Sequence, residues 1–120
     1  MRRGIVLLAQ FDPALAGEAS KARPCIIVSN VGTIRAATRV NRGSLVAVPL
    51  TTKTNYVHPD AQVLIDDDMD IAQMGLTAPS KVQTEQIRAI SLERVYRELG
   101  QTPAWIMHQV DDALRFHLSL

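Results

Sequence analysis

The chain has 120 residues, a length typical of one domain, and 47% of them are hydrophobic, a share that excludes an intrinsically disordered polypeptide. No apolar run is long enough to cross a membrane, and the single cysteine excludes an internal disulfide. We therefore expect one folded domain over residues 1–120. We also expect it in the cytoplasm, because the apolar run near the start is too short for a signal peptide.

The net charge of +1 conceals an uneven distribution of charged residues. Residues 1–60 carry eight Lys or Arg and three Asp or Glu, whereas residues 61–120 carry five and nine. This asymmetry favours a locally positive groove, although folding can mix the two halves.

Short apolar segments rich in β-branched residues dominate most of the chain and are separated by turn signals. They predict strands, because a strand presents branched side chains well and Gly, Pro or Asp then ends it. The predicted strands cover residues 4–11, 23–29, 44–50 and 61–65, then one or two strands within 80–90, and 95–99. Residues 31–42 are predicted as a turn or short helix and residues 66–70 as an acidic turn.

The last segment has a helical pattern instead. Thr102 can cap a helix, and Pro103 suits the first turn. Five residues then recur at helical spacing and predict one face of an amphipathic helix. They are Ile106, Val110, Ala113, Leu114 and His117. The whole pattern predicts a mainly β architecture, a small barrel or roll, with a C-terminal helix.

The sequence contains no strong motif for binding a metal or a cofactor. A calcium-binding loop starting at Asp66 would need glycine at position 71 and glutamate at position 77, where the sequence has Ile71 and Thr77. The three histidines lack zinc spacing, and Cys25 lies inside an apolar strand, where a thiol is usually inert. We therefore expect no metal and no cofactor.

Two strand ends carry polar groups that can bind phosphate. Arg23 stands at the start of a predicted buried strand, so its guanidinium can bind a phosphate through two parallel N–H groups. The alternative is that Arg23 pairs with a nearby carboxylate such as Glu18. Thr51 and Thr52 follow another apolar strand, and their hydroxyls can donate to a phosphate oxygen or simply close a turn.

These fragments, taken in order, resemble the MazF/PemK/Kid family of toxins from end to end. The resemblance rests on the following motifs: Arg3-Gly4, Asp12-Pro13, Gly17-Glu18, Arg23-Pro24 with a strand running to Ser29-Asn30, Val48-Pro49-Leu50-Thr51-Thr52, Glu85-Gln86-Ile87-Arg88, and a helix containing Val110-Asp111-Asp112-Ala113-Leu114. The sequence departs from the family pattern at Ile5, where an acidic residue is usual, at Leu7 and at Val31.

The resemblance implies an SH3-like barrel with a C-terminal helix, assembled as a homodimer. It also implies metal-independent, sequence-specific cleavage of single-stranded RNA by attack of a 2′-hydroxyl on the adjacent phosphate, restrained by an antitoxin protein. The implied catalytic residues are Arg23 and Thr51, and the implied RNA contacts are Arg3, Glu18, Asn30, Thr52, Glu85 and Gln86. Because arginine stays protonated, Arg23 suits charge stabilisation, and either Glu18 or substrate positioning would have to assist the proton transfer.

Two other functions remain open at this stage. A CcdB-like inhibitor would share the fold but would act by binding a protein target such as gyrase. An RNA-binding barrel that does not cut would stack bases on aromatic side chains. The intact motifs Arg23-Pro24 and Thr51-Thr52 argue against the inhibitor. The RNA-binding barrel ranks lower because the five aromatic residues are scattered along the sequence: Phe11, Tyr56, Tyr96, Trp105 and Phe116.

Overall fold

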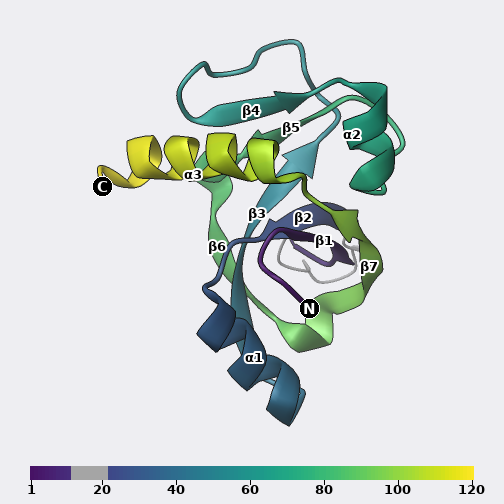
Figure 1. Ribbon diagram of the computed structural model, residues 1–120, viewed down its shortest axis with the longest axis vertical. Coiled ribbons are helices and arrows are strands. Elements are labelled where there is room, and N and C mark those ends of the chain that lie inside the picture. The colour runs from purple at the N-terminus through teal and green to yellow at the C-terminus, as the bar shows by residue number, and fades with distance from the viewer. Residues whose placement is uncertain (12–21) are drawn as a thin grey trace, which may run out of the picture.

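The computed structural model describes residues 1–11 and 22–120, and its architecture is an antiparallel sheet of seven strands with three α-helices (Figure 1). The sheet order is β4-β5-β3-β2-β1-β7, and β6 also pairs with β3. The strands are β1 (Ile5–Ala9), β2 (Arg23–Ile27), β3 (Ser44–Thr51), β4 (Gln62–Ile65), β5 (Ser80–Gln83), β6 (Arg88–Ser91) and β7 (Val95–Gln101). This confirms the mainly β class with a C-terminal helix.

The expectation was a small barrel or roll, and in the described residues the sheet is not closed into a barrel. The outermost strands of the sheet path, β4 and β7, do not pair with each other there, so the sheet stays open. The long strand β3 explains this arrangement, because it pairs with β6 near its start and with β5 near its end. The 3₁₀ turn η2 (Leu92–Arg94) then separates β6 from β7, which pairs with β1 instead.

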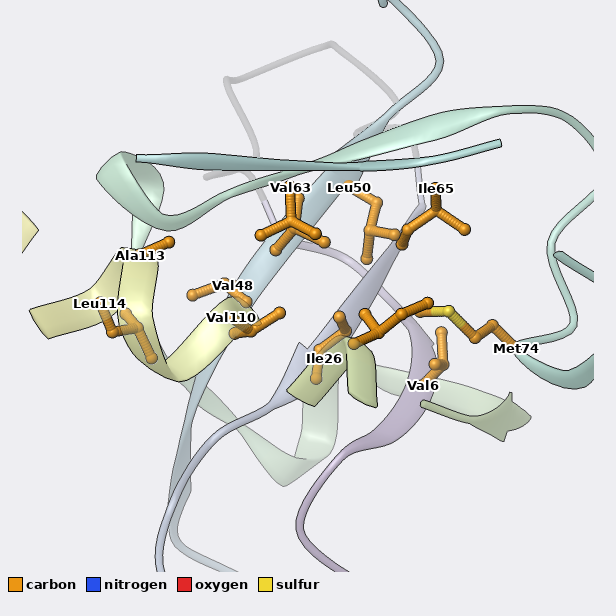
Figure 2. Packing of buried hydrophobic residues seen from close by; sticks show 12 residues of the cluster. Val6, Ile26, Val48, Leu50, Val63, Ile65, Met74, Val110, Ala113 and Leu114 are labelled. Carbon is orange, nitrogen blue, oxygen red and sulfur yellow. The ribbon is translucent and has the colours of Figure 1, made fainter. Parts of the chain in front are cut away.

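The alternation of side chains along the central strands produces two hydrophobic clusters, one on each face of the sheet. Val6, Ile26 and Val48 belong to the first cluster, which α3 (Ala104–Leu118) covers (Figure 2). Their sequence neighbours Leu7, Cys25 and Ala47 belong to the second cluster, which α1 (Val31–Val40) helps to cover. Figure 1 shows the consequence, with α3 beside β4 and β5 and with α1 at the far end of β3.

The C-terminal helix has the predicted buried face but a different beginning and end. Ile106, Val110, Ala113 and Leu114 are buried, as expected. His117 is exposed, contrary to the prediction, because it lies in the last turn, after the last residue of α3 that reaches the core. The N-cap position is occupied by Pro103 rather than by Thr102. The backbone N–H of Thr102 instead donates to the carbonyl of Gly4, and its buried hydroxyl has no partner among the described residues.

The acidic segment at residues 66–70 starts a helix and is not only a turn. The carboxylate of Asp67 accepts hydrogen bonds from the backbone N–H groups of Met69 and Asp70 and so caps α2 (Asp68–Gln73). The run therefore has a local structural role that explains its composition. Within the described ranges, no helix is long and apolar enough to span a membrane.

Candidate functional site

Arg23 and Thr51, far apart in the sequence, lie at the same end of two neighbouring strands. In the antiparallel pair of β2 and β3, Cys25 faces Pro49 and Ile27 faces Ala47. Continuing this register by two residues places Arg23 opposite Thr51, and cross-strand partners lie on the same face of a sheet. Both residues are half-buried, so their side chains are supported by the sheet and still reachable by a ligand.

The hydroxyl of Thr51 has its proton available for donation. Its oxygen accepts a hydrogen bond from the backbone N–H of Lys53 at 3.2 Å. A hydroxyl accepts through its lone pairs, so this bond leaves the O–H free to donate to a phosphate oxygen. The same bond closes a tight turn after β3, which is one of the two interpretations of Thr51, and donation to a phosphate stays a prediction. Thr52 is exposed in that turn.

Lys81 extends this pair on the other side of Thr51, and it is not among the residues predicted from the sequence. In the pair of β3 and β5, Thr51 faces Lys81, and in the pair of β5 and β4, Lys81 faces Leu64. We call Arg23, Thr51 and Lys81, on three adjacent strands, the polar row. The available signal was strand alternation: Val82 lies in the core, so Lys81 had to point to the opposite face.

Glu85, which follows β5 in the sequence, is hydrogen-bonded to the neighbouring strand β4. Its Oε2 accepts a hydrogen bond from Gln62 Nε2 at 2.9 Å, and Gln62 Oε1 accepts from the backbone N–H of His58. Gln62 lies on β4 two residues before Leu64, hence on the same face as Lys81. The Oε1 atom of Glu85 is buried and has no partner among the described residues. Gln86 is exposed in the 3₁₀ turn η1 (Thr84–Gln86).

Arg3 and Asn30 have structural partners away from the polar row. Arg3 Nε donates to the carbonyl of Val28 at 3.0 Å, and its Nη2 pairs with Asp111 Oδ1 at 2.8 Å. The side chain of Asn30 accepts a hydrogen bond from the backbone N–H of Thr33 and caps α1, past the opposite end of β2 from Arg23. Thus the structure places Arg23, Thr51 and Thr52 at one end of the sheet, with the Glu85 segment farther along β3, between its pairings with β5 and β6, and these two residues elsewhere. Glu18 lies outside the described residues.

Neither the cysteine nor the histidines form a nucleophilic or metal centre here. Burial raises the pKa of the Cys25 thiol to about 12, so the thiol stays protonated and is a core residue, as expected. The Nδ1 atom of His58 accepts hydrogen bonds from the backbone N–H groups of Asp60 and Ala61. In residues 1–11 and 22–120, no three His, Cys, Asp or Glu side chains gather as a metal site would require.

The chain is similar in sequence to toxins and endoribonucleases of one family. A family model described as "PemK-like, MazF-like toxin of type II toxin-antitoxin system" matches residues 2–118. The chain is 40% identical over 120 residues to endoribonuclease MazF9 of Mycobacterium tuberculosis (strain ATCC 25618 / H37Rv). The alignment covers 100% of this chain and 98% of that protein. It is 26% identical over 121 residues to endoribonuclease EndoA of Bacillus subtilis (strain 168), with coverage of 100% and 96%.

Solved structures show the same fold. An endoribonuclease in complex with its cognate antitoxin, from a mycobacterial species, superposes with a TM-score of 0.72 at 25% identity, covering 100% of this chain and 96% of that one. A MazE–MazF structure from Deinococcus radiodurans superposes with a TM-score of 0.69 at 17% identity, with the same coverage. At 17% identity this second likeness shows the fold alone.

Proposed function

The chain belongs to the family of PemK-like and MazF-like toxins of type II toxin–antitoxin systems, and from that premise we propose that it is a sequence-specific endoribonuclease that cuts single-stranded RNA without a metal. The observation that carries the proposal is the register of β2 and β3, which sets Arg23 beside Thr51 in a chain 40% identical to a named endoribonuclease over its full length. The polar row then supplies cationic and hydroxyl donors at a single place on the sheet.

The proposed chemistry is an internal transfer at phosphorus. The 2′-oxygen of one nucleotide attacks the adjacent phosphorus and loses its proton, while the bond from phosphorus to the 5′-oxygen breaks and that oxygen takes up a proton. The products are a 2′,3′-cyclic phosphate and a 5′-hydroxyl. Negative charge grows on the phosphate oxygens during attack, and donors fixed before the reaction stabilise it most effectively.

Arg23 and Thr51 are the donors that we assign to this step. A guanidinium presents two parallel N–H groups to two phosphate oxygens, which suits Arg23 to the developing charge. Thr51 donates its free hydroxyl proton to the same phosphate. A guanidinium is a poor proton acceptor, so the proton of the 2′-hydroxyl passes to another group, for which Glu18 is the candidate, or to water within a well-positioned complex.

Partners follow from the same premise. We propose that the active species is a homodimer and that its host keeps it inactive with an antitoxin. In support, a mycobacterial endoribonuclease to which the chain is similar was solved in complex with its cognate antitoxin. The other proposed RNA contacts are Thr52, Glu85, Gln86 and Glu18. For Arg3 and Asn30, which the resemblance also implied, the hydrogen bonds within the fold favour a structural role.

The deciding experiment is cleavage of a mixed RNA by the purified chain in EDTA, followed by sequencing of the 5′ ends. We expect discrete cuts at one short sequence, with 5′-hydroxyl ends that can be ligated only after phosphorylation. Cleavage that stops in EDTA would contradict metal independence. Intact RNA under all conditions would contradict the nuclease and would favour a CcdB-like inhibitor that acts by binding a protein.

A further inference from the structure

Lys81 is a buried cation in the polar row. Only 9% of the residue is exposed, although it points away from the hydrophobic cluster that contains its neighbour Val82. Removing an ammonium group from water is costly, so a buried lysine normally has a charged partner. The partners of Lys81 therefore indicate whether its role is structural.

The described partners of Lys81 carry no negative charge. Its Nζ donates to the backbone carbonyl of Tyr56 at 2.6 Å and lies 6.0 Å from the centre of the Tyr56 ring. The ion pairs found among the described residues join Arg3 to Asp111 and Arg115 to Asp112, and no described carboxylate lies within 4.0 Å of Lys81. An ammonium has three N–H donors, so at least one donor and the full charge remain for a ligand.

The position of this charge points to an anion bound at Thr51. Lys81 is the direct cross-strand partner of Thr51, and neighbouring strands lie about 4.8 Å apart. The lysine stem is long enough for its ammonium to reach an anion that the Thr51 hydroxyl also contacts. Arg23 stands on the other side of Thr51, so an anion there would lie between two cations.

Tyr56 places an aromatic ring beside the same charge. The ring is 64% exposed, in the segment between β3 and β4. It contacts His58 edge-on, with the ring centres 6.5 Å apart, and His58 in turn contacts Phe116 at 5.7 Å. The hydrogen bond from Lys81 holds the backbone of Tyr56. A ring that is fixed at its backbone and still exposed can stack on an unpaired base.

We propose that Lys81 and Tyr56 form a nucleotide subsite next to Thr51, in which Lys81 donates to a phosphate oxygen and the Tyr56 ring stacks on an adjoining base. RNA fits because each nucleotide presents an anionic group and an aromatic face a few ångströms apart. This inference rests on the proposed endoribonuclease function and adds two residues to its RNA contacts. A purely structural Lys81 would only hold the Tyr56 segment in place.

Salt dependence of binding separates the two roles of Lys81. The probe is a single-stranded RNA that carries the mapped cleavage sequence, with a 2′-deoxy sugar at the attacking nucleotide so that it is not cut. Binding is measured by fluorescence anisotropy at several salt concentrations. One lost phosphate contact lowers the slope of log affinity against log salt by about 0.7 for single strands. We expect this change in Lys81→Met, and an unchanged slope would overturn the phosphate contact.

Three further variants complete the measurement of Lys81. Lys81→Arg should keep the wild-type slope, because it keeps the charge. Lys81→Gln, which retains an N–H donor but no charge, should show the Lys81→Met slope and serves as the test if Lys81→Met does not fold. Arg39→Met is the charge-matched control, since it removes a cation from the exposed side of α1, near the Ser44 end of β3 rather than the Thr51 end. It should keep the wild-type slope.

Tyr56 is tested with the same RNA. Replacing a base-stacking aromatic residue by alanine weakens binding about 5- to 100-fold, so we expect this loss in Tyr56→Ala with an unchanged salt slope. Tyr56→Phe keeps the ring and should bind like the wild type. Equal binding by Tyr56→Ala and the wild type would overturn the stacking contact. A wild-type chain that cuts no RNA would contradict the proposed function, and this inference with it, whereas normal cutting with unchanged variants would contradict the inference alone.

Discussion

Two regions of the molecule hold a largely buried cation, and they differ in what surrounds it. At the start of β1, Arg3 contacts a carbonyl of the β2 end and the carboxylate of Asp111 on α3, so its charge is balanced within the fold. On β5, opposite the Thr51 end of β3, the described partners of the Lys81 ammonium are only the carbonyl and ring of Tyr56. A balanced charge joins elements together, whereas an unbalanced one is available to a ligand.

Arg3 and Arg23 differ in the same way, although the family resemblance implied that both act on RNA. Arg3 was predicted to contact RNA and Arg23 to take part in cleaving it. Arg3 uses its guanidinium to connect β1, β2 and α3, and its side chain is 33% exposed. Arg23 stands beside Thr51 at the end of the sheet where Lys81 lies. We therefore expect mutations in the polar row to reduce activity and mutations at Arg3 to reduce stability.

The largest effect is expected from Arg23→Ala. The substitution removes the charged donor that stabilises the developing phosphate charge, so the cleavage rate should fall by about 10²–10³, equivalent to about 3–4 kcal/mol. Single-turnover cleavage of an RNA with the mapped sequence measures this directly. Wild-type rates in Arg23→Ala would refute the catalytic assignment.

Two measurements keep this result interpretable. Arg23→Lys should recover only part of the rate, because an ammonium cannot form the two-pronged contact of a guanidinium. Thermal unfolding of both variants should match the wild type if the role of Arg23 is catalytic. A large loss of stability in Arg23→Ala would instead identify Arg23 as a structural ion-pair partner.

Thr51→Ala should reduce the rate less, by about 5-fold, because a hydrogen bond from a neutral donor contributes about 1 kcal/mol. The same single-turnover assay applies. Thr51→Ser keeps the hydroxyl and should stay near the wild-type rate. A loss in Thr51→Ala as large as that in Arg23→Ala would show that the hydroxyl has a more central role than charge stabilisation.

Arg3→Ala tests whether the charge of Arg3 stabilises the fold. Losing a largely buried ion pair and a hydrogen bond to a carbonyl should lower the free energy of unfolding by about 1–2 kcal/mol. Denaturant unfolding measures that loss, and the cleavage rate of the folded variant should stay within a few-fold of the wild type. Unchanged stability together with lost RNA binding would reverse the assignment and restore Arg3 as an RNA contact.

Sequence patterns predicted those features that depend on local side-chain alternation. The strands around Cys25 and Val48 were identified because branched apolar residues fill them, and the buried face of α3 because its spacing is helical. The N-cap was predicted wrongly at Thr102 because a tertiary bond to Gly4 uses its backbone, which no local pattern reveals. The open sheet also depends on which strands pair along β3, which is not encoded in local composition.

The candidate site was only half predictable for the same reason. Arg23 and Thr51 were found as strand-end polar groups, but their adjacency depends on the register of two strands. Lys81 was missed because one lysine in a short strand resembles an ordinary surface residue until its partner strand is known. Likewise Tyr56 and Phe116, distant in sequence, both contact His58 in the structure.

The smallest effect is expected at the second ion pair of α3, Asp112 with Arg115, which is the matched control for Arg3. Their side chains are 62% (Arg115) and 79% (Asp112) exposed, so water screens the attraction and holding both side chains costs entropy. Asp112→Ala also replaces a poor helix former by the best one, which offsets part of the loss. The free energy of unfolding should therefore change by less than about 0.5 kcal/mol in the same denaturant titration. A loss as large as that in Arg3→Ala would show that charge balance on α3, rather than the buried connection made by Arg3, stabilises this region.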